Sequence, residues 1–347
     1  MNMSPSAPVR FAIAGLNHGH VDWWFRRPAH SDMQLVGISE PNRDLAKQFA
    51  ARYSLDPGLF HTDLGAMLDA IQPSAVMAFG PTFDHLAVVQ ACAPRGVHVM
   101  VEKPLAVSST HAMQIAELAQ RHHVHVLTNY ETTWYASNHE AYRLAHDERV
   151  AGDLRKIVVH DGHWGPVEIG CPPEFLAWLT DPVLNGGGAI MDFGCYGANL
   201  ITWLMDGAAP SSVTAVTQQT KPKIYPNVDD EATIVLTYPH TQGIVQGSWN
   251  WPWHRKDMEI YGATGVIHAV NQTTLRLRDG LSREERTQIL QPRAAPFDDV
   301  FAYFAAVVRG DVTPGANDLS GLANNLMVMR ILDAARESAR LGRTVNL

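Results

Sequence analysis

The sequence predicts an α/β half followed by an α+β half: a parallel sheet with helices on both faces, then a domain on a large, mostly antiparallel open sheet. Two observations carry this prediction. Residues 9 to about 128 alternate short apolar runs with helical patterns, as βαβ units do. From residue 129 strand-like runs follow one another through short turns, which favours antiparallel pairing. We therefore expect two domains, residues 1–128 and 129–347.

In the first half, each apolar run is short enough to be a buried strand of a parallel sheet. The predicted strands are residues 9–14, 34–39, 75–78, 98–101 and 124–128. The predicted helices are residues 21–29, 43–53, 64–71, 84–95 and 108–121. Each helix is expected to cross over between neighbouring parallel strands.

In the second half, period-two alternation marks half-buried strands. The predicted strands are residues 156–163, 212–218, 231–238, 243–249, 258–262, 266–270 and 275–278. Helices are predicted over residues 137–146, 296–308 and 319–341. Such a run of strands, closed by two helices, is typical of an α+β domain.

Length and charge set limits on function. The chain has 347 residues and a formal net charge of −8, which disfavours a nucleic-acid surface because such surfaces need clustered Lys and Arg. Three widely spaced cysteines suit a reducing compartment. Residues 1–8 lack the apolar segment of a secretory signal, and no apolar run reaches the length of a membrane span. We expect a cytoplasmic protein that binds neither nucleic acid nor a membrane.

The first predicted strand runs into a glycine turn that opens a helix, the order of a Rossmann dinucleotide-binding unit. Gly15 fits the first glycine of the fingerprint, Asn17 stands at the second position and His20 replaces the third. Asn tolerates the left-handed conformation better than most residues, so Asn17 is expected to substitute for glycine. Gly19 belongs to the same turn, and His18 and His20 are expected to shape the mouth of the cofactor site.

The second strand ends at Glu40, about twenty residues past the glycine turn, where an acid meets the adenosine ribose hydroxyls of NAD. This acid would repel the 2′-phosphate of NADP, although Arg43 partly offsets the repulsion. NAD is therefore expected and NADP stays open. Gly80 and Pro81 break another strand from its helix, so their loop faces the same crevice, and His85 is placed with them among the cofactor contacts.

Glu102, Lys103 and Pro104 follow a further short apolar run. Pro104 disfavours the helical conformation for Lys103 and holds it extended at the strand end. In an open parallel sheet the ligand crevice lies outside the carboxyl ends of the strands. Lys103 is therefore expected to point into the site, with Glu102 and Lys103 near the cofactor, and the alternative is a solvated strand cap.

These motifs, in this order, resemble the Gfo/Idh/MocA family of oxidoreductases over nearly the whole chain. The likeness rests on Glu102-Lys103-Pro104, the glycines at 186–188 leading to residues 192–196, the run 260–265 and the terminal helix around 334–340. The resemblance implies an enzyme that transfers a hydride between NAD(P) and a CH–OH carbon of a sugar or related polyol. It also implies a homodimer or homotetramer formed through the open face of the C-terminal sheet.

A helix predicted after residues 186–188 carries Asp192 and Tyr196 four residues apart, and therefore on one face. Asn199 and Trp203 extend this stripe, which is expected to line a cleft after a flexible glycine loop; the alternative is a solvated helix face. In many members of the family, histidine stands where this chain has Tyr196. Here the resemblance is to the glucose-fructose oxidoreductase and dihydrodiol dehydrogenase branch, which has tyrosine.

Tyrosine has a reference pKa of about 10, so a tyrosine base needs a nearby positive charge. We expect Lys103 to supply that charge. Lys103 and Tyr196 would contact the reacting hydroxyl, Tyr196 would exchange its proton, and Lys103 would stabilise the alkoxide. Asp192 would orient the sugar or the lysine.

Residues 129–138 depart from the family pattern, since Glu131 stands near the usual arginine. An acid beside the substrate would favour a neutral polyol over a carboxylate or phosphate. Asn129 and His163 are expected substrate contacts. The aromatic run at 249–256 either packs in the core or at an interface, or stacks on the substrate.

Histidine clusters at 122–125 and 160–163 lack a complete ligand set, so no metal is expected. Two other functions stay open: an NAD-dependent enzyme that cleaves glycosides through transient oxidation, and a non-catalytic regulator that binds dinucleotide and sugar. The presence of Lys103, Asp192 and Tyr196 argues against the regulator, because a binding protein needs no proton-transfer pair.

Overall fold

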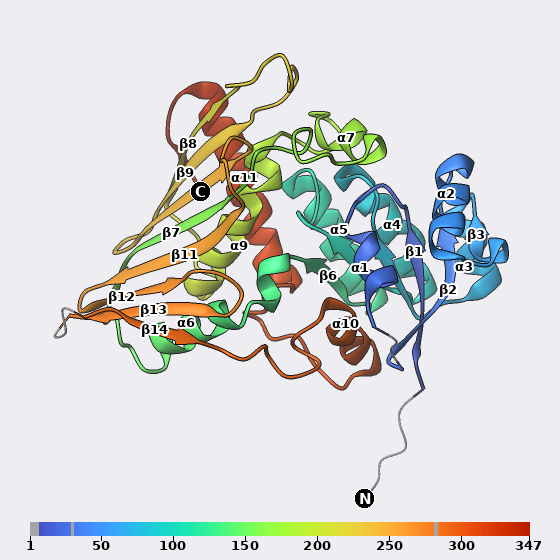
Figure 1. Cartoon of the computed structure of the whole chain (residues 1–347), viewed down its shortest axis with the longest axis horizontal. Coiled ribbons are helices and arrows are strands. Elements are labelled where there is room, and N and C mark those ends of the chain that lie inside the picture. The colour runs from blue at the N-terminus through green and yellow to red at the C-terminus, as the bar shows by residue number, and fades with distance from the viewer. Residues whose placement is uncertain (1–6, 29–30, 281–283) are drawn as a thin grey trace, which may run out of the picture.

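The computed structural model describes residues 7–28, 31–280 and 284–347, and its two sheets lie side by side with helices between and around them (Figure 1). The first sheet is parallel, with strand order β3-β2-β1-β4-β5-β6. Its strands are β1 (Val9–Ala14), β2 (Met33–Ser39), β3 (Phe60–His61), β4 (Ala75–Ala78), β5 (His98–Glu102) and β6 (Val126–Asn129). The parallel Rossmann-type sheet predicted from the sequence is therefore confirmed; only the short edge strand β3 was not predicted.

Crossover helices cover both faces of this sheet, as predicted. They are α1 (Val21–Arg26), α2 (Arg43–Tyr53), α3 (Leu64–Ile71), α4 (His85–Cys92) and α5 (Ser109–His122). The helix predicted over 21–29 is shorter, because Pro28 follows an extended Arg27 that already ends α1. Residue 29 lies outside the described residues. The side chain of Asn42 caps α2 by accepting the N–H groups of residues 44 and 45.

The second sheet has the order β14-β13-β12-β11-β7-β10-β9-β8-β15 and is antiparallel except where β10 runs parallel to β7. Its strands are β7 (Leu154–Gly162), β8 (Ser212–Gln218), β9 (Glu231–Thr237), β10 (Gln242–Ser248), β11 (Arg255–Gly262), β12 (Gly265–Ala269), β13 (Thr274–Asp279), β14 (Arg286–Ile289) and β15 (Val345–Asn346). The predicted large, mostly antiparallel sheet is confirmed, and the edge strands β14 and β15 are additions to it.

Helices cover one face of the second sheet and leave the other open (Figure 1). The remaining helices of the described chain are α6 (Ala136–His146), α7 (Pro173–Leu179), α8 (Ala189–Asp192), α9 (Gly194–Leu204), α10 (Val300–Arg309) and α11 (Leu322–Leu341). Gly197 lets α9 lie directly on β10, since a Cβ there would come within 2.4 Å of a methyl carbon of Val245. This close contact fixes the start of α9, which faces the first sheet.

The last helices tie the two sheets together. Phe301 and Phe304 of α10 pack with Phe11 and Ile13 on one face of the first sheet. Helix α11 packs on β8 and α9 and also touches α5. The division at residues 128 and 129 stays a prediction, because the C-terminal helices share cores with the first sheet. No helix among the described residues is long and apolar enough to cross a bilayer.

Candidate active site

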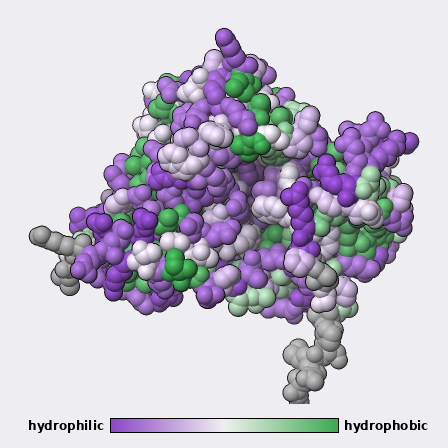
Figure 2. Space-filling model, viewed as in Figure 1, coloured by the Kyte–Doolittle hydropathy of each residue, from purple (hydrophilic) through white to green (hydrophobic). Residues whose placement is uncertain are grey.

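A cavity of about 270 Å³ lies between the carboxyl edge of the first sheet and the covered face of the second. The face of the molecule shown in Figure 2 is hollowed between the two sheets. The glycine turn, the end of β5, α7, α8, α9 and the start of β11 contribute to the cavity wall. The polar residues that line it are His18, His20, Lys103, Glu131, His163, Asp192, Tyr196, His254 and Lys256.

Lys103 and Asp192 form a buried ion pair in this wall. The Lys103 ammonium donates to a carboxylate oxygen of Asp192 and, at 3.0 Å, to its backbone carbonyl. Burial alone would lower the pKa of Lys103, but the Asp192 carboxylate outweighs it and the pKa is raised. The indole N–H of Trp249 donates to the second carboxylate oxygen of Asp192 at 2.9 Å. Lys103 is thus held charged and fixed, with Asp192 as its anchor.

The glycines before Asp192 form a fixed turn, which corrects the expected flexible loop. The Asp229 carboxylate accepts the N–H groups of Gly188 and Ile190 at 2.9 and 2.7 Å. A Cβ on Gly188 would lie 1.8 Å from the Asp229 carbonyl oxygen, so only glycine fits there. The turn positions α8, at whose end Asp192 lies.

Of the four residues in the predicted polar stripe, the first two line the cavity and the last two do not. The helix breaks at Phe193, between α8 and α9, and only Asp192 and Tyr196 reach the cavity. Asn199 is fully buried and donates to the carbonyl of Leu319 at 2.8 Å. Trp203 stacks on the ring of residue 142. The break rotates the second part of the stripe into the core.

The hydroxyl of Tyr196 lies beside Lys256 rather than Lys103, which corrects the expected pairing. The Tyr196 oxygen is 3.4 Å from the Lys256 nitrogen, whereas the Lys103 nitrogen faces the Tyr196 ring 5.3 Å from its centroid. Lys103 is drawn away from the hydroxyl by Asp192. Burial, followed by the charges of Asp161 and Glu131, raises the pKa of Tyr196 well above its ordinary value, so this side chain is a phenol at neutral pH.

Glu131 lines the cavity and pairs with Lys256 at 2.6 Å. Burial would raise the pKa of Glu131, but Lys256 lowers it to about 2. Glu131, which the sequence placed near the substrate, therefore borders the cavity, and the positive charge of Lys256 neutralises its carboxylate.

His163 also lines the cavity, and its Nδ1 accepts the N–H of Gly165 at 2.9 Å. Burial lowers the pKa of His163 to about 4, so the neutral ring carries its proton on Nε2. His163 can therefore donate a hydrogen bond from Nε2.

The glycine turn approaches the β4 loop backbone to backbone. Gly15 has φ of +83°, and a Cβ on it would come within 2.9 Å of Gly80. Space is open beside Gly19 and Gly80, where a Cβ would meet no atom within 4 Å. Asn17 does not adopt the left-handed conformation we expected, because Gly15 already supplies it. These open backbones leave room for a ligand to lie against the turn.

Glu40 is 2% exposed and accepts the N–H groups of Leu16 and Asn42 at 2.9 and 2.8 Å. Glu40 thus joins the glycine turn to the start of α2. Glu40 and Arg43 both line a second hollow of about 610 Å³ between α2 and α3.

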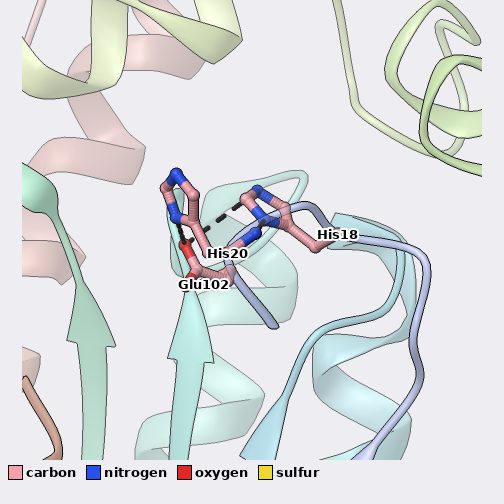
Figure 3. Close-up of side chains that lie close together, drawn as sticks. All are labelled: His18, His20 and Glu102. Atoms are coloured by element: carbon pink, nitrogen blue, oxygen red, sulfur yellow. Dashed lines mark hydrogen bonds and ion pairs between the residues drawn. The ribbon is translucent and has the colours of Figure 1, made fainter. Parts of the chain in front are cut away.

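His18 and His20 of the glycine turn lie together with Glu102 at the end of β5 (Figure 3). Glu102 accepts from His20 Nδ1 at 3.0 Å and from the side-chain amide of Asn129 at 2.8 Å, while His18 Nε2 lies 4.0 Å away. Burial would raise the pKa of Glu102, but the two histidines and these hydrogen bonds lower it to about 2. The trio is compact enough to hold a metal ion, as are His160, Asp257 and Glu259.

Hydrogen positions decide what the trio does. His18 Nδ1 accepts the backbone N–H of His20 at 3.1 Å, so neutral His18 carries its proton on Nε2, toward Glu102. An ionised Glu102 only accepts, so His20 Nδ1 carries a proton as well. Both nitrogens nearest the carboxylate thus carry protons. The hydrogen bonds to Glu102 come from His20 and Asn129, whereas His18 Nε2 has no hydrogen-bond partner. The absence of a metal stays a prediction.

Three sequence-predicted contacts lie behind the cavity wall. Both ends of the Asn129 amide are occupied, one by Glu102 and the other by the indole N–H of Trp134 at 3.1 Å. His85 is buried at the start of α4, where its Nδ1 lies 3.2 Å from the carbonyl of Leu105. Pro81 lies in the β4 loop and not in the cavity.

His254 and Lys256 belong to the run at 249–256, for which the sequence left substrate contact open without giving either residue a role of its own. The short helix α7 was not predicted. Helix α7 brings Phe175 to the cavity and places the indole N–H of Trp178 3.4 Å from the carbonyl of Asn17. In the aromatic run, Trp249 is fully buried and Trp253 is 63% exposed. The core interpretation is therefore right for Trp249.

Two family profiles match the chain. The profile described as an oxidoreductase family with an NAD-binding Rossmann fold matches residues 9–130, and the GFO/IDH/MocA C-terminal domain matches residues 139–268. The chain belongs to the Gfo/Idh/MocA family. As a member, it is an oxidoreductase with an NAD-binding domain, as the sequence predicted.

Relatives of this Gfo/Idh/MocA protein extend over most of its length. A trans-1,2-dihydrobenzene-1,2-diol dehydrogenase of Xenopus laevis is 24% identical over 314 residues, covering 88% of this chain and 90% of that protein. A D-xylose 1-dehydrogenase (NADP+) of Haloarcula marismortui is 25% identical over 344 residues, covering 94% and 91%. An inositol dehydrogenase homolog of Azotobacter vinelandii, solved with NAD+, has the same fold, with a TM-score of 0.84, 19% identity and coverage of 99% and 98%.

Proposed function

We propose that this enzyme oxidises a CH–OH group of a sugar or related polyol, or reduces the corresponding carbonyl, with NAD as its cofactor. One observation carries the proposal: the buried Lys103–Asp192 pair and the Tyr196 hydroxyl face one cavity at the carboxyl edge of an NAD-binding sheet. The relatives named as xylose and dihydrodiol dehydrogenases support this class of substrate.

The glycine turn fits a dinucleotide. The open backbones of Gly19 and Gly80 would receive the phosphates, and Glu40 would meet the adenosine ribose. Arg43, at the rim of the adjoining hollow, leaves NADP possible. His18, His20 and Glu102 would border the same cofactor from below. When bound, NAD supplies the acceptor or donor of a hydride.

The residues of the cavity would handle the oxygen of the substrate. A charged Lys103 stabilises an oxygen that gains negative charge, and Asp192 keeps this lysine in place. Tyr196 is held as a phenol, so it can donate a proton to that oxygen during reduction. During oxidation the reverse transfer applies, and the phenolate of Tyr196 accepts the proton of the substrate hydroxyl. His163 offers an N–H to a further hydroxyl. Because the lysines and acids are paired, the cavity suits a neutral polyol.

Absorbance of reduced nicotinamide tests this proposal directly. The protein is incubated with NAD+ or NADP+ and a panel of aldoses, inositols and other polyols. Net reduction with one class and faster turnover with NAD+ than with NADP+ are the expected results. Cofactor binding without net reduction would contradict the proposal, and an aryl-glycoside assay would then separate glycoside cleavage from a regulator.

We further propose a cytoplasmic homodimer or homotetramer that contacts neither nucleic acid nor a membrane. Support comes from the outer face of the second sheet, where Val158, Ile244 and Val235 form a row across three strands. The three cysteines are free thiols, two of them buried, as suits a reducing compartment.

A further inference from the structure

Lys256 lies on the inner face of the second sheet, with its side chain only 6% exposed. It precedes the buried Met258 and Ile260 by two and four positions on β11, so alternation turns all three the same way. The antiparallel register sets Lys256 directly opposite Asp161 of β7. A buried lysine at such a position needs acidic partners.

Three oxygen-bearing side chains surround the Lys256 ammonium. The Glu131 carboxylate is 2.6 Å away, the Tyr196 hydroxyl 3.4 Å and the Asp161 Oδ1 4.0 Å. The ammonium also lies 4.4 Å from the centroid of the Tyr196 ring. Among the described residues, Lys256 is the cation that reaches the Tyr196 oxygen. The other titratable groups that interact with Tyr196 or Lys256 include Lys103, Asp192, Cys195, His163 and His254.

Asp161 is buried and its Oδ1 has no hydrogen-bond partner. Burial raises the pKa of Asp161 well above its ordinary value. Burial would lower the pKa of Lys256, but Asp161 and Glu131 raise it, so the amine stays protonated. The ionised Glu131 carboxylate thus keeps Lys256 protonated, next to a phenol whose own pKa is raised.

The same lysine also lines a second cavity. A separate cavity of about 550 Å³ is lined by Lys256, Glu131 and His254, which line the substrate cavity as well, and by Tyr135, Trp253 and Gln272. Glu131 keeps 25% of its side chain exposed. The Lys256–Glu131 pair is therefore a wall between two cavities, with water-accessible space on the side away from Lys103.

We propose that Lys256 resupplies Tyr196 with protons from this second cavity, so that protons and substrate use different openings. The inference rests on the proposed function. In reduction, the Tyr196 O–H bond breaks as the substrate oxygen takes its proton. The Tyr196 oxygen then takes a proton from the Lys256 ammonium, and the neutral amine takes one from water beside Glu131. In oxidation the same transfers run backward.

Proton transfer between Lys256 and Tyr196 is feasible in both directions because the pKa values of both groups are raised. A phenolate formed at Tyr196 is a strong base, since burial and carboxylates raise the pKa of its phenol. An ammonium with a raised pKa is still acid enough for such a base. In this proposal Lys256 acts on the substrate oxygen through Tyr196 and is therefore a positioning residue, whereas Lys103 acts on the substrate oxygen itself.

Titration of the cofactor-free protein tests the pairing without any turnover. With ζ-13C-tyrosine, the Tyr196 resonance is assigned by its loss in Tyr196→Phe and followed over the pH range in which the fold survives. We expect ionisation to begin at higher pH in Lys256→Met than in the wild type, because a cation favouring the phenolate is lost. Lys256→Arg should resemble the wild type. Identical curves, or no ionisation in any of the proteins, would overturn the proposal.

Turnover in the direction of reduction tests the supply of protons. We expect Lys256→Met to lower kcat about 100-fold with little change in KM, the size of a lost general acid. Added alkylamines should restore the activity of Lys256→Ala, more strongly for the more acidic ammonium ions. The control is Lys223→Met, which removes an exposed lysine outside the cavities.

The two experiments distinguish a failure of the proton supply by Lys256 from a failure of the proposed dehydrogenase function. A wild type that reduces no sugar, with a Tyr196 titration that still depends on Lys256, would refute the function and keep the pairing. A wild type that reduces sugars and a Lys256→Met variant that equals it would refute the proton supply alone.

Discussion

At the scale of single residues, the candidate site contains two buried lysines, each with its own carboxylate. The side chains of Lys103 and Lys256 are 7% and 6% exposed. Lys103 pairs with Asp192 beside the glycine turn, and Lys256 pairs with Glu131 on the far side of Tyr196. The two pairs give the cavity one cation for the substrate oxygen and one for the phenol.

Replacing Tyr196 with Phe removes the hydroxyl and keeps the ring that packs in the wall. We expect kcat to fall at least about 100-fold, because the proton donor is lost. NADH affinity should be nearly unchanged, since the glycine turn and Glu40 are untouched. Steady-state kinetics and a fluorescence titration with NADH measure the two effects. Turnover close to that of the wild type would remove Tyr196 from the mechanism.

Replacing Lys103 with Met leaves the buried Asp192 carboxylate without its cation. We expect the free energy of unfolding at neutral pH to fall by about 3–5 kcal/mol. Although burial would raise the pKa of Asp192, Lys103 lowers it below 3.8, so the stabilisation is present above that pH and is lost in acid.

Urea unfolding, followed by tryptophan fluorescence, measures this loss. The matched control is the double variant Lys103→Met with Asp192→Asn, which removes both charges and should recover part of the stability. A single variant as stable as the wild type at neutral pH would contradict the prediction.

Sequence alone could locate Lys103 and its surroundings but not the group of residues around Lys256. Lys103 was predictable because a local feature, a proline after a buried strand, fixes its backbone. Lys256 had no local motif, yet a signal existed: it shares the inward register of Met258 and Ile260 on β11. Its partners Glu131 and Asp161 come from distant segments, so only the folded sheet brings them together.

At the scale of elements, the strands and long helices followed the sequence closely, because apolar periodicity marks them. The bounds predicted for α2 and α3 are those observed. Besides the short edge strands β3, β14 and β15, the sequence missed the break between α8 and α9 at Phe193 and the seven-residue α7. Short elements of this kind carry too few residues for a periodic signal.

Helix α7 gives a prediction of its own, since Trp178 donates its indole N–H to the carbonyl of Asn17 at 3.4 Å. Trp178→Phe removes that hydrogen bond and keeps an aromatic ring. We expect the Kd for NADH to rise about 2- to 12-fold, the value of one neutral hydrogen bond. Calorimetric titration measures it, with Trp253→Phe as the exposed control. Equal affinities would show that α7 does not hold the glycine turn.

At the scale of the whole molecule, each of the two sheets could be predicted from its own sequence pattern. The packing that joins the two sheets could not. The chain returns at its end to both sheets: α10 packs on the first and α11 on the second. No local pattern marks which sheet a C-terminal helix will cover, because any apolar face would serve.

The open face of the second sheet predicts assembly. Light scattering should give the mass of a dimer or tetramer for the wild type. Ile244→Lys introduces a charge in the middle of the apolar row between Val158 and Val235, and we expect it to yield monomers. Val183→Lys changes a residue that is 63% exposed elsewhere and should leave the mass unchanged. A wild type that is monomeric would refute the proposed assembly.

The position of α10 has a consequence for how the chain folds during its synthesis on the ribosome. Phe11, Ile13 and Met100 of the nucleotide-binding sheet are covered by a helix that begins only at Val300. A ribosome adds about 5–20 residues per second, so this sheet waits roughly ten to thirty seconds after β6 emerges with part of one face uncovered. During that interval the nascent chain presents an apolar surface to the cell. Chains cut short before α10 would be clients of chaperones and proteases rather than smaller enzymes.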